Sequence, residues 1–93
     1  MRRPFLAGNW KMNLDRRSAL DLVHAVRAAA DRRADVDVAV FPSYVYLDEV
    51  ARALAGSRVR LGAQDVCEED SGAFTGAVSA SMLKDVGCEL VIL

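Results

Sequence analysis

The chain has 93 residues, of which 53% are hydrophobic and 27% are charged, a balance that suits one small soluble, globular domain and argues against disorder. Its 12 basic and 13 acidic residues leave a formal net charge of -1, so it lacks the basic field that drives binding to nucleic acid or to anionic membrane surfaces. The apolar run after Arg3 ends at Asn9, which is too short for a signal peptide, and no run approaches the roughly 18 apolar residues of a membrane span. We therefore expect a cytoplasmic protein with no nucleic-acid or membrane partner.

The first predicted elements are a strand and a helix. Residues 5–8 form a short apolar strand, and the polar residues 9–13 follow it. Ser18, with Asp21 three residues later, fits the capping box that begins many helices. Apolar residues then recur at helical spacing up to Arg33. The residues of this stripe, which we expect to face the core, are Ala19, Leu22, Val23, Val26 and Ala30.

The middle of the chain repeats this alternation. Residues 36–41 form a second apolar run, and Pro42 closes it because proline has no backbone donor for a central strand. A helix is predicted from Ser43, with Gly56 as its left-handed terminator. The residues of its apolar face are Tyr44, Leu47, Val50, Ala51 and Leu54. Residues 59–64 are then predicted to form a third strand.

A long polar stretch separates the third strand from the last helix. Residues 65–76 are rich in Asp, Glu, Ser and Gly, and loops of this length usually carry function. A short helix is predicted over residues 79–86, with Gly87 as its stop. The side chains expected to face inward from this helix are Met82, Leu83 and Val86. Residues 89–93 form a fourth apolar strand.

The alternation of strands and helices predicts the fold class. The order is βαβαβαβ, and each strand is nearly continuous in apolar residues, as in strands buried on both faces of a parallel sheet with right-handed crossovers. We therefore predict an α/β fold on a parallel sheet. The first and last strands would have open edges, and the sequence stops inside the apolar run 90–93. We expect the missing partners to come from further sequence or from a second copy of the chain.

Asn9 and Lys11 are the first residues that could carry chemistry. The period of two along a strand puts both on one side, at the carboxyl end of the first strand, where α/β folds bind ligands. Lys11 stands between Trp10 and Met12, and a partly buried ammonium needs an anionic partner such as a phosphate or a developing enolate. The alternatives are a turn-forming asparagine and a lysine whose stem lies on the tryptophan while its head reaches water.

The other chemically reactive side chains show no pattern typical of a metal site. Cys67 and Cys88 lack metal-ligand spacing, and we expect them to be free structural thiols. His24 lies mid-helix without an orienting partner, which favours a surface residue. The acidic residues after the third strand lack the alternate-position spacing of a calcium loop, so solvation is their expected role. They are Asp65, Glu68, Glu69 and Asp70.

The long loop has a candidate contact point at its tip. Gly72 and Gly76 flank the tip and are expected to act as hinges, because no glycine-rich phosphate-binding pattern is present. An exposed Phe74 next to Thr75 would contact another subunit. The alternative for Phe74 is a local hydrophobic clasp within the loop.

Residues 7–13, Ala-Gly-Asn-Trp-Lys-Met-Asn, resemble the start of the triosephosphate isomerase family. Three further blocks agree in the same order. They are Phe41-Pro42 at the end of the second strand, Leu61-Gly62-Ala63-Gln64 at the end of the third, and Ser71-Gly72-Ala73-Phe74-Thr75-Gly76 with Ser81-Met82-Leu83-Lys84-Asp85 in the long loop and the helix after it. The resemblance spans essentially the whole chain, and four blocks at the correct spacing make it highly specific.

The resemblance implies that residues 1–93 form a single partial domain, namely strands 1 to 4 and helices 1 to 3 of a (β/α)8 TIM barrel. The family is homodimeric and interconverts D-glyceraldehyde 3-phosphate and dihydroxyacetone phosphate through an enediol(ate), without a cofactor. By resemblance, Asn9 helps to hold the substrate, and Lys11 supplies positive potential to the phosphate and to the charge developing on the substrate oxygens. Gln64, Asp65 and Thr75 would lie in the subunit interface, beside Phe74.

Some family features are replaced or missing. Asp65 and Ala77 stand where the family usually has asparagine and glutamate. After a strand like residues 90–93, the family continues with Gly-His-Ser-Glu-Arg-Arg, which contains its electrophilic histidine, and its glutamate base lies later. We therefore expect this chain to be an inactive segment of the isomerase. The alternative is a non-catalytic α/β module that self-associates through its open strand edges.

Overall fold

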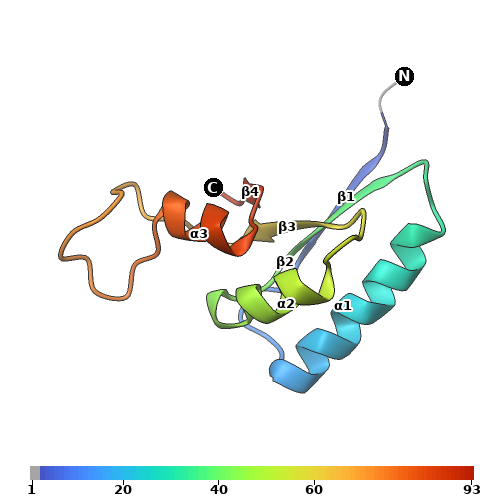
Figure 1. Ribbon diagram of the computed structural model, residues 1–93, viewed down its shortest axis with the longest axis horizontal. Helices are drawn as coiled ribbons and strands as arrows, with labels where there is room; N and C mark the ends of the chain where they lie inside the picture. Colours follow the sequence, from blue (N-terminus) through green and yellow to red (C-terminus); the bar gives the residue numbers. More distant parts are fainter. Residues whose placement is uncertain (1–2) are drawn as a thin grey trace.

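A computed structural model of the chain describes residues 3–93, so the first two residues of the predicted 1–93 domain lie outside the described part. In chain order its elements are β1 (Phe5–Asn9), α1 (Arg16–Asp31), β2 (Asp37–Phe41), the 3-10 helix η1 (Tyr44–Tyr46), α2 (Leu47–Ala53), β3 (Arg60–Ala63), α3 (Ala80–Val86) and β4 (Leu90–Val91). Within the described residues the strands pair in parallel in the order β1-β2-β3-β4 (Figure 1). The predicted α/β fold with its parallel βαβαβαβ order is confirmed.

The main core lies between the sheet and the helices. Because strands that follow one another in order are joined by crossovers of the same right hand, the helices fall on one face of the sheet. On that face Val40 of β2 and Leu61 of β3 join a buried cluster with Val23 of α1 and Val50 of α2, both fully buried. Burying a side chain of this size stabilises the fold by about 1.5 to 3 kcal/mol. The apolar stripes predicted for the first two helices therefore hold α1 and α2 on the sheet. The prediction is wrong for Leu22, which is 38% exposed because it lies at the edge of the buried stripe of α1.

A second close contact lies between Phe41 and Gly62. Val40 lies opposite Leu61 in the β2–β3 register, so the next residues, Phe41 and Gly62, point away from the helices. A Cβ atom at position 62 would overlap the Phe41 ring. The absence of a side chain at Gly62 therefore lets the ring bury itself against β3, where Phe41 is only 5% exposed.

The capping residue of α1 differs from the prediction. Asp15 is the N-cap, its carboxylate accepts from the Ser18 backbone N–H at 2.9 Å, and the Asp15 N–H donates to Ser18 Oγ at 3.0 Å. The predicted Ser18–Asp21 box is wrong because Ser18 already lies in the first turn, as the reciprocal partner of Asp15. The hydrogen bonds that the Ser18 N–H and the Ser18 hydroxyl donate to Asp15 Oδ1, at 2.9 and 2.7 Å, lower the pKa of Asp15.

The end of α1 is held by an arginine from a distant segment. The Arg58 guanidinium donates to the carbonyl oxygens of Arg33 at 2.6 Å, Ala34 at 3.3 Å and Ala30 at 3.4 Å. The last carbonyls of a helix have no partner within the helix. Arg58 therefore binds carbonyl groups in the last turn of α1 and in the segment just after it, and it ties them to the segment that leads into β3.

Other element boundaries lie close to those predicted. The first helix ends at Asp31 instead of Arg33, β3 and β4 are shorter than residues 59–64 and 89–93, and the helix after Pro42 begins as the 3-10 turn η1. Met82 was expected to face inward, but it is 56% exposed. This prediction is wrong because α3 has only two turns, and its buried side is occupied by Leu83, whereas Met82 faces the neighbouring loop.

The outer strands expose apolar side chains. In the described part of the chain, β1 pairs only with β2, and β4 pairs only with β3. Phe5 and Leu6 are 48% and 58% exposed, and Leu93 is fully exposed after β4. The predicted open edges are confirmed. None of the helices within residues 3–93 is long and apolar enough to cross a membrane.

Candidate functional site

The turn after β1 contains Asn9, Trp10 and Lys11 at the carboxyl end of the sheet. Trp10 is buried, and its backbone N–H donates to the Phe41 carbonyl at 3.2 Å, which extends the β1–β2 ladder by one residue. The chain then bends because Lys11 has a φ of 56°, in the left-handed region that few non-glycine residues adopt. The prediction that Asn9 and Lys11 share one side of a continuous strand is therefore wrong, since the extended backbone stops before Lys11.

Side chains from the ends of neighbouring strands fix the backbone of Lys11. Its N–H donates to Asn9 Oδ1 at 2.9 Å. Its carbonyl oxygen accepts from Ser43 Oγ at 2.9 Å and from Gln64 Nε2 at 2.8 Å. The same Gln64 nitrogen donates to the Phe41 carbonyl at 2.8 Å. The ends of β1, β2 and β3 thus converge on one residue.

The side chains of the two predicted substrate residues differ in their freedom. Lys11 is exposed, so the expectation of a partly buried ammonium is wrong. None of the ion pairs found within residues 3–93 involves Lys11, which leaves its charge available to an anion. The Asn9 oxygen is engaged in the turn, as the turn-forming alternative proposed, while the Asn9 amide nitrogen points to no partner among the hydrogen bonds of the described chain.

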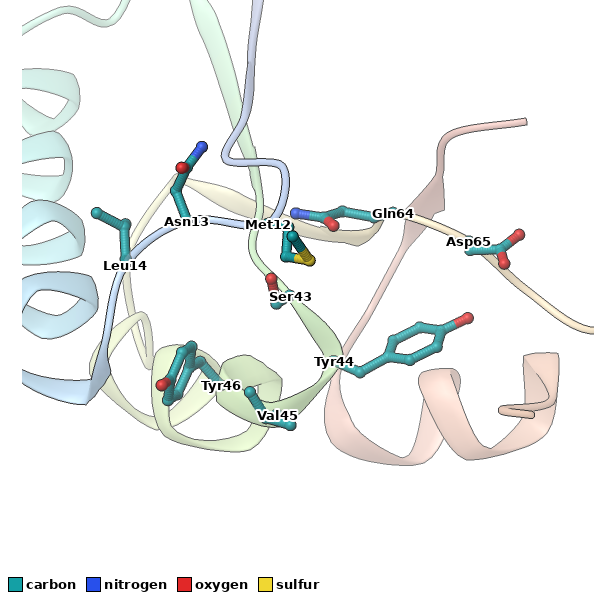
Figure 2. Close-up of a pocket in the computed structure, with 9 residues that line it drawn as sticks. All are labelled: Met12, Asn13, Leu14, Ser43, Tyr44, Val45, Tyr46, Gln64 and Asp65. Atoms are coloured by element: carbon teal, nitrogen blue, oxygen red, sulfur yellow. The ribbon is translucent and has the colours of Figure 1, made fainter. Parts of the chain in front are cut away.

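A groove of about 550 Å³ opens beside this turn. Its lining residues follow β1, β2 and β3 and are Met12, Asn13, Leu14, Ser43, Tyr44, Val45, Tyr46, Gln64 and Asp65 (Figure 2). Met12 is 94% exposed and Val45 is 76% exposed, so apolar groups stand open to solvent here. Figure 2 shows the Tyr44 ring reaching toward Asp65. Burial, together with the charge of Asp65, raises the pKa of Tyr44.

The segment between β3 and α3 projects from the body of the molecule as a loop (Figure 1). Its two ends are joined because the Cys67 N–H donates to the Val78 carbonyl at 2.8 Å. At its tip, Phe74 is 51% exposed, and its ring lies so close to Gly72 that a Cβ there would be 2.8 Å from a ring carbon. Phe74 therefore forms the local clasp and still presents half of its surface, next to the exposed Thr75.

The remaining candidates lie apart from this turn. Cys67 and Cys88 are free thiols, as predicted, and burial raises the pKa of Cys88. His24 is exposed on α1, which confirms a surface histidine. Within residues 3–93, no group of three or more His, Cys, Asp or Glu side chains is arranged to hold a metal ion.

Ser43 was missed by the sequence analysis, and Gln64 was expected only at the subunit interface. Their shared signal is position: Ser43 comes directly after Phe41-Pro42, and Gln64 follows β3. The carboxyl ends of parallel neighbours meet at one edge of a sheet. Polar residues at these two positions could therefore have been predicted to approach Lys11, although the hydrogen bonds themselves depend on the bend at Lys11.

Comparison with known proteins decides the family. A family model described as triosephosphate isomerase matches residues 4–93. The chain belongs to the triosephosphate isomerase family. The triosephosphate isomerase of Alkaliphilus oremlandii is 46% identical over 93 residues, covering 100% of this chain and 37% of the relative. That of Magnetococcus marinus is 50% identical over 94 residues, again covering 100% of this chain and 37% of the relative.

A solved structure agrees with the fold. The crystal structure of triosephosphate isomerase from Bartonella henselae superimposes with a TM-score of 0.91 at 36% sequence identity, covering 99% of this chain and 38% of that protein. The predicted (β/α)8 assignment is confirmed, with β1 to β4 as the N-terminal strands of a TIM barrel. The chain spans little more than a third of the length of these relatives. That residues 1–93 act as one partial domain stays a prediction.

Proposed function

We propose that the chain supplies the anion-binding corner of a triosephosphate isomerase, which interconverts D-glyceraldehyde 3-phosphate and dihydroxyacetone phosphate in glycolysis and gluconeogenesis, and that it acts in the cytoplasm. The observation that carries the proposal is the left-handed Lys11 at the carboxyl end of the strands. Unfavourable backbone conformations persist mainly where the surroundings hold them, and they cluster at functional sites. Lys11 is fixed at its backbone and exposed at its side chain.

The chemistry of the family's reaction requires a positive charge at this place. Isomerisation removes a proton from the carbon next to a carbonyl, so negative charge develops on a substrate oxygen, and the substrate also carries a phosphate. In this proposal the Lys11 ammonium attracts both, and the Asn9 amide nitrogen donates a hydrogen bond to the substrate. A lysine suits this role because its charge is compact. Proton transfer of this kind uses no cofactor.

The same proposal predicts that these 93 residues alone do not catalyse the reaction. The family relies on a glutamate base and a neutral histidine. Here His24 is exposed on α1, Glu49 pairs with Arg16 at 2.6 Å, and Glu89 pairs with Arg60 at 3.2 Å. Glu68 and Glu69 lie in the projecting loop. None of these histidine and glutamate groups within the described chain adjoins the Lys11 turn, so the glutamate base and the histidine on which the family relies have no counterpart beside the substrate corner.

A chimera tests the proposal. The chain is joined to the portion of the Alkaliphilus oremlandii relative that it does not cover, and isomerase activity is followed in a coupled assay on glyceraldehyde 3-phosphate. We expect turnover by the chimera and none above background by the 93-residue chain. Turnover by the chain alone would contradict the assignment of the essential groups, and a folded but inactive chimera would contradict the proposed function.

We also propose that the assembled enzyme is a homodimer that uses the loop and the groove as complementary surfaces. Phe74 and Thr75 stand at the exposed tip of a loop whose ends are joined, whereas Gln64 and Asp65 line the apolar groove elsewhere on the chain. In a symmetric dimer, each loop can enter the groove of the other copy. The exposed Met12 and Val45 would then be covered.

A second candidate function is a non-catalytic module that self-associates. The observation in its favour is the exposure of Phe5 and Leu6 on β1 together with Leu93 after β4. Open edges offer unpaired backbone groups to another strand. Light scattering on the 93-residue chain should then report oligomers whose size depends on concentration. A stable, well-folded monomer would rule out this alternative.

A further inference from the structure

We propose that Gln64 and Ser43 are positioning residues, which act on the reaction by holding Lys11 in its left-handed conformation. The inference rests on the proposed function, because it gives the Lys11 ammonium its role. It adds residues that make no contact with the substrate themselves. Their function is to fix the direction in which the Lys11 side chain leaves the backbone.

The backbone of Lys11 requires such support. At a φ of 56° the Cβ atom of an L-residue crowds its own backbone, which is why glycine usually occupies this region. A lysine released from its partners would return to the extended or helical region. Its side chain would then leave the turn in another direction, and a point charge acts on a substrate only from the right place. Fixing the backbone conformation of Lys11 therefore also fixes the position of its ammonium group.

The amide of Gln64 is suited to this task. Its Nε2 carries two hydrogens, and it reaches the carbonyl oxygens of Lys11 and Phe41, both at 2.8 Å. Phe41 O also accepts from the Trp10 N–H at 3.2 Å. One side chain at the end of β3 thus ties the end of β2 to the turn after β1. Gln64 is half-buried, and its hydrogen bond to Phe41 O is partly buried, so water replaces that bond less readily than one at an open surface.

Ser43 supplies the second bond to the same carbonyl oxygen. Its Oγ donates to Lys11 O at 2.9 Å. Ser43 is placed by Pro42, which is fully buried directly after β2. Two donors on one carbonyl, together with the Asn9 acceptor on the Lys11 N–H, leave the Lys11 peptide groups little freedom to rotate.

The first test uses nuclear magnetic resonance on the 93-residue chain and its variants Gln64→Met and Ser43→Ala. Met keeps the length of Gln without its donors. We expect the Lys11 amide hydrogen to exchange at least tenfold faster, and the Lys11 Cα shift to move toward extended values, in both variants. Leu14 is the internal control, since it also has a positive φ, 79°, but no hydrogen bond to Gln64. Ser57→Ala is the matched control, because Ser57 accepts from the Val59 N–H far from Lys11.

Unchanged Lys11 signals in Gln64→Met would overturn the proposal. So would an equal change at Lys11 and Leu14, because that pattern means general loosening of the turn. Neither result depends on catalysis. The inference can therefore fail while the proposed function stands, and an inactive chimera would refute the proposed function without deciding the role of Gln64.

The second test separates positioning from structural support by kinetics in the chimera described above. Gln64→Met should lower kcat/KM at least tenfold at a temperature well below Tm. In a Lys11→Met background, the same change should lower kcat/KM less than threefold, because Gln64 acts through the Lys11 charge that this background lacks. Equal losses in both backgrounds would show a structural role and overturn the proposal.

Discussion

The two ends of the sheet are held together in different ways. At the carboxyl end, neutral side chains bind backbone groups, as Gln64 does with Lys11, and a lysine is kept in an unfavourable conformation. At the amino end, arginines pair with carboxylates or cap carbonyls in ordinary conformations. These contacts are Arg3–Asp37, Arg33–Asp35, Arg60–Glu89 and the bonds from Arg58 to the end of α1.

If the proposed function holds, this difference separates function from stability within one small sheet. In TIM barrels, reactions take place at the carboxyl end of the strands, while the opposite end serves stability. At the amino end every arginine named above already has a carboxylate or carbonyl partner, so none of these side chains is free to bind a ligand. At the carboxyl end the Lys11 charge has none among the ion pairs of residues 3–93. Substitutions at the carboxyl end should therefore lower activity without lowering stability, and substitutions at the amino end should lower stability without lowering activity.

The largest effect is expected from Lys11→Met in the chimera. In the proposed function the Lys11 charge stabilises developing negative charge, so its removal should lower kcat/KM by about a hundredfold to a thousandfold. Tm should not fall, because Lys11 is exposed and the substitution leaves its backbone hydrogen bonds in place. Lys84→Met on α3 is the matched control and should leave kcat/KM unchanged. Equal activity of the two variants would contradict the role of Lys11.

The next effect concerns association through the carboxyl end. Val45→Asp puts a charge into the apolar groove, and burying an unpaired carboxylate in an interface is unfavourable. The dissociation constant of the dimer that we propose for the chimera should rise by about a hundredfold, as measured by sedimentation equilibrium. Leu22→Asp, at a partly exposed position on α1, should leave it unchanged. A dimer that tolerates Val45→Asp would place the interface elsewhere.

At the amino end, Arg58→Met should lower the free energy of unfolding by about 1 to 2 kcal/mol, because it removes the hydrogen bonds to Ala30 O in the last turn of α1 and to Arg33 O just after it, at a site that solvent partly screens. Urea denaturation measures this loss. Arg52→Met is the control. It breaks an exposed pair with Asp48, so the change should stay within about 0.5 kcal/mol. A stable Arg58→Met variant would show that the carbonyls find water instead.

The smallest effects are expected from acid titration. Hydrogen bonding to Arg33 lowers the pKa of Asp35 to about 2, and Ser18 lowers that of Asp15. A lowered pKa in the folded state stabilises the fold above the unfolded value, and this contribution disappears as the pH falls through the folded value. Tm should therefore decrease slightly as the pH falls from about 4 to 2, and this decrease should be smaller in Asp35→Asn. An unchanged profile would mean that this exposed pair contributes nothing.

The sequence was most informative where burial decides structure. The stripe containing Val23 and the β-branched Val40 predicted α1 and β2 because such residues must leave water in a regular pattern. The sequence was less informative where two patterns fit the same local feature equally well. Asp15-x-x-Ser18 and Ser18-x-x-Asp21 have the same spacing, and only the helix itself decides which one caps it.

The site was predicted in part. The location of Asn9 and Lys11 at the carboxyl end of the first strand was predicted, but the bend at Lys11 was not, because it depends on donors from Ser43 and Gln64, 32 and 53 residues away. The overlap between Phe41 and position 62 was hidden for the same reason. Both features depend on contacts between residues that are distant in the sequence, so the local sequence pattern does not predict them.

The central claim is that the carboxyl end of this sheet serves reaction and the amino end serves stability. The most direct test measures kcat/KM and Tm together for Lys11→Met and Arg58→Met in the same chimera. We predict that Lys11→Met lowers kcat/KM and leaves Tm unchanged, and that Arg58→Met lowers Tm and leaves kcat/KM unchanged. Both quantities falling together in both variants would contradict it.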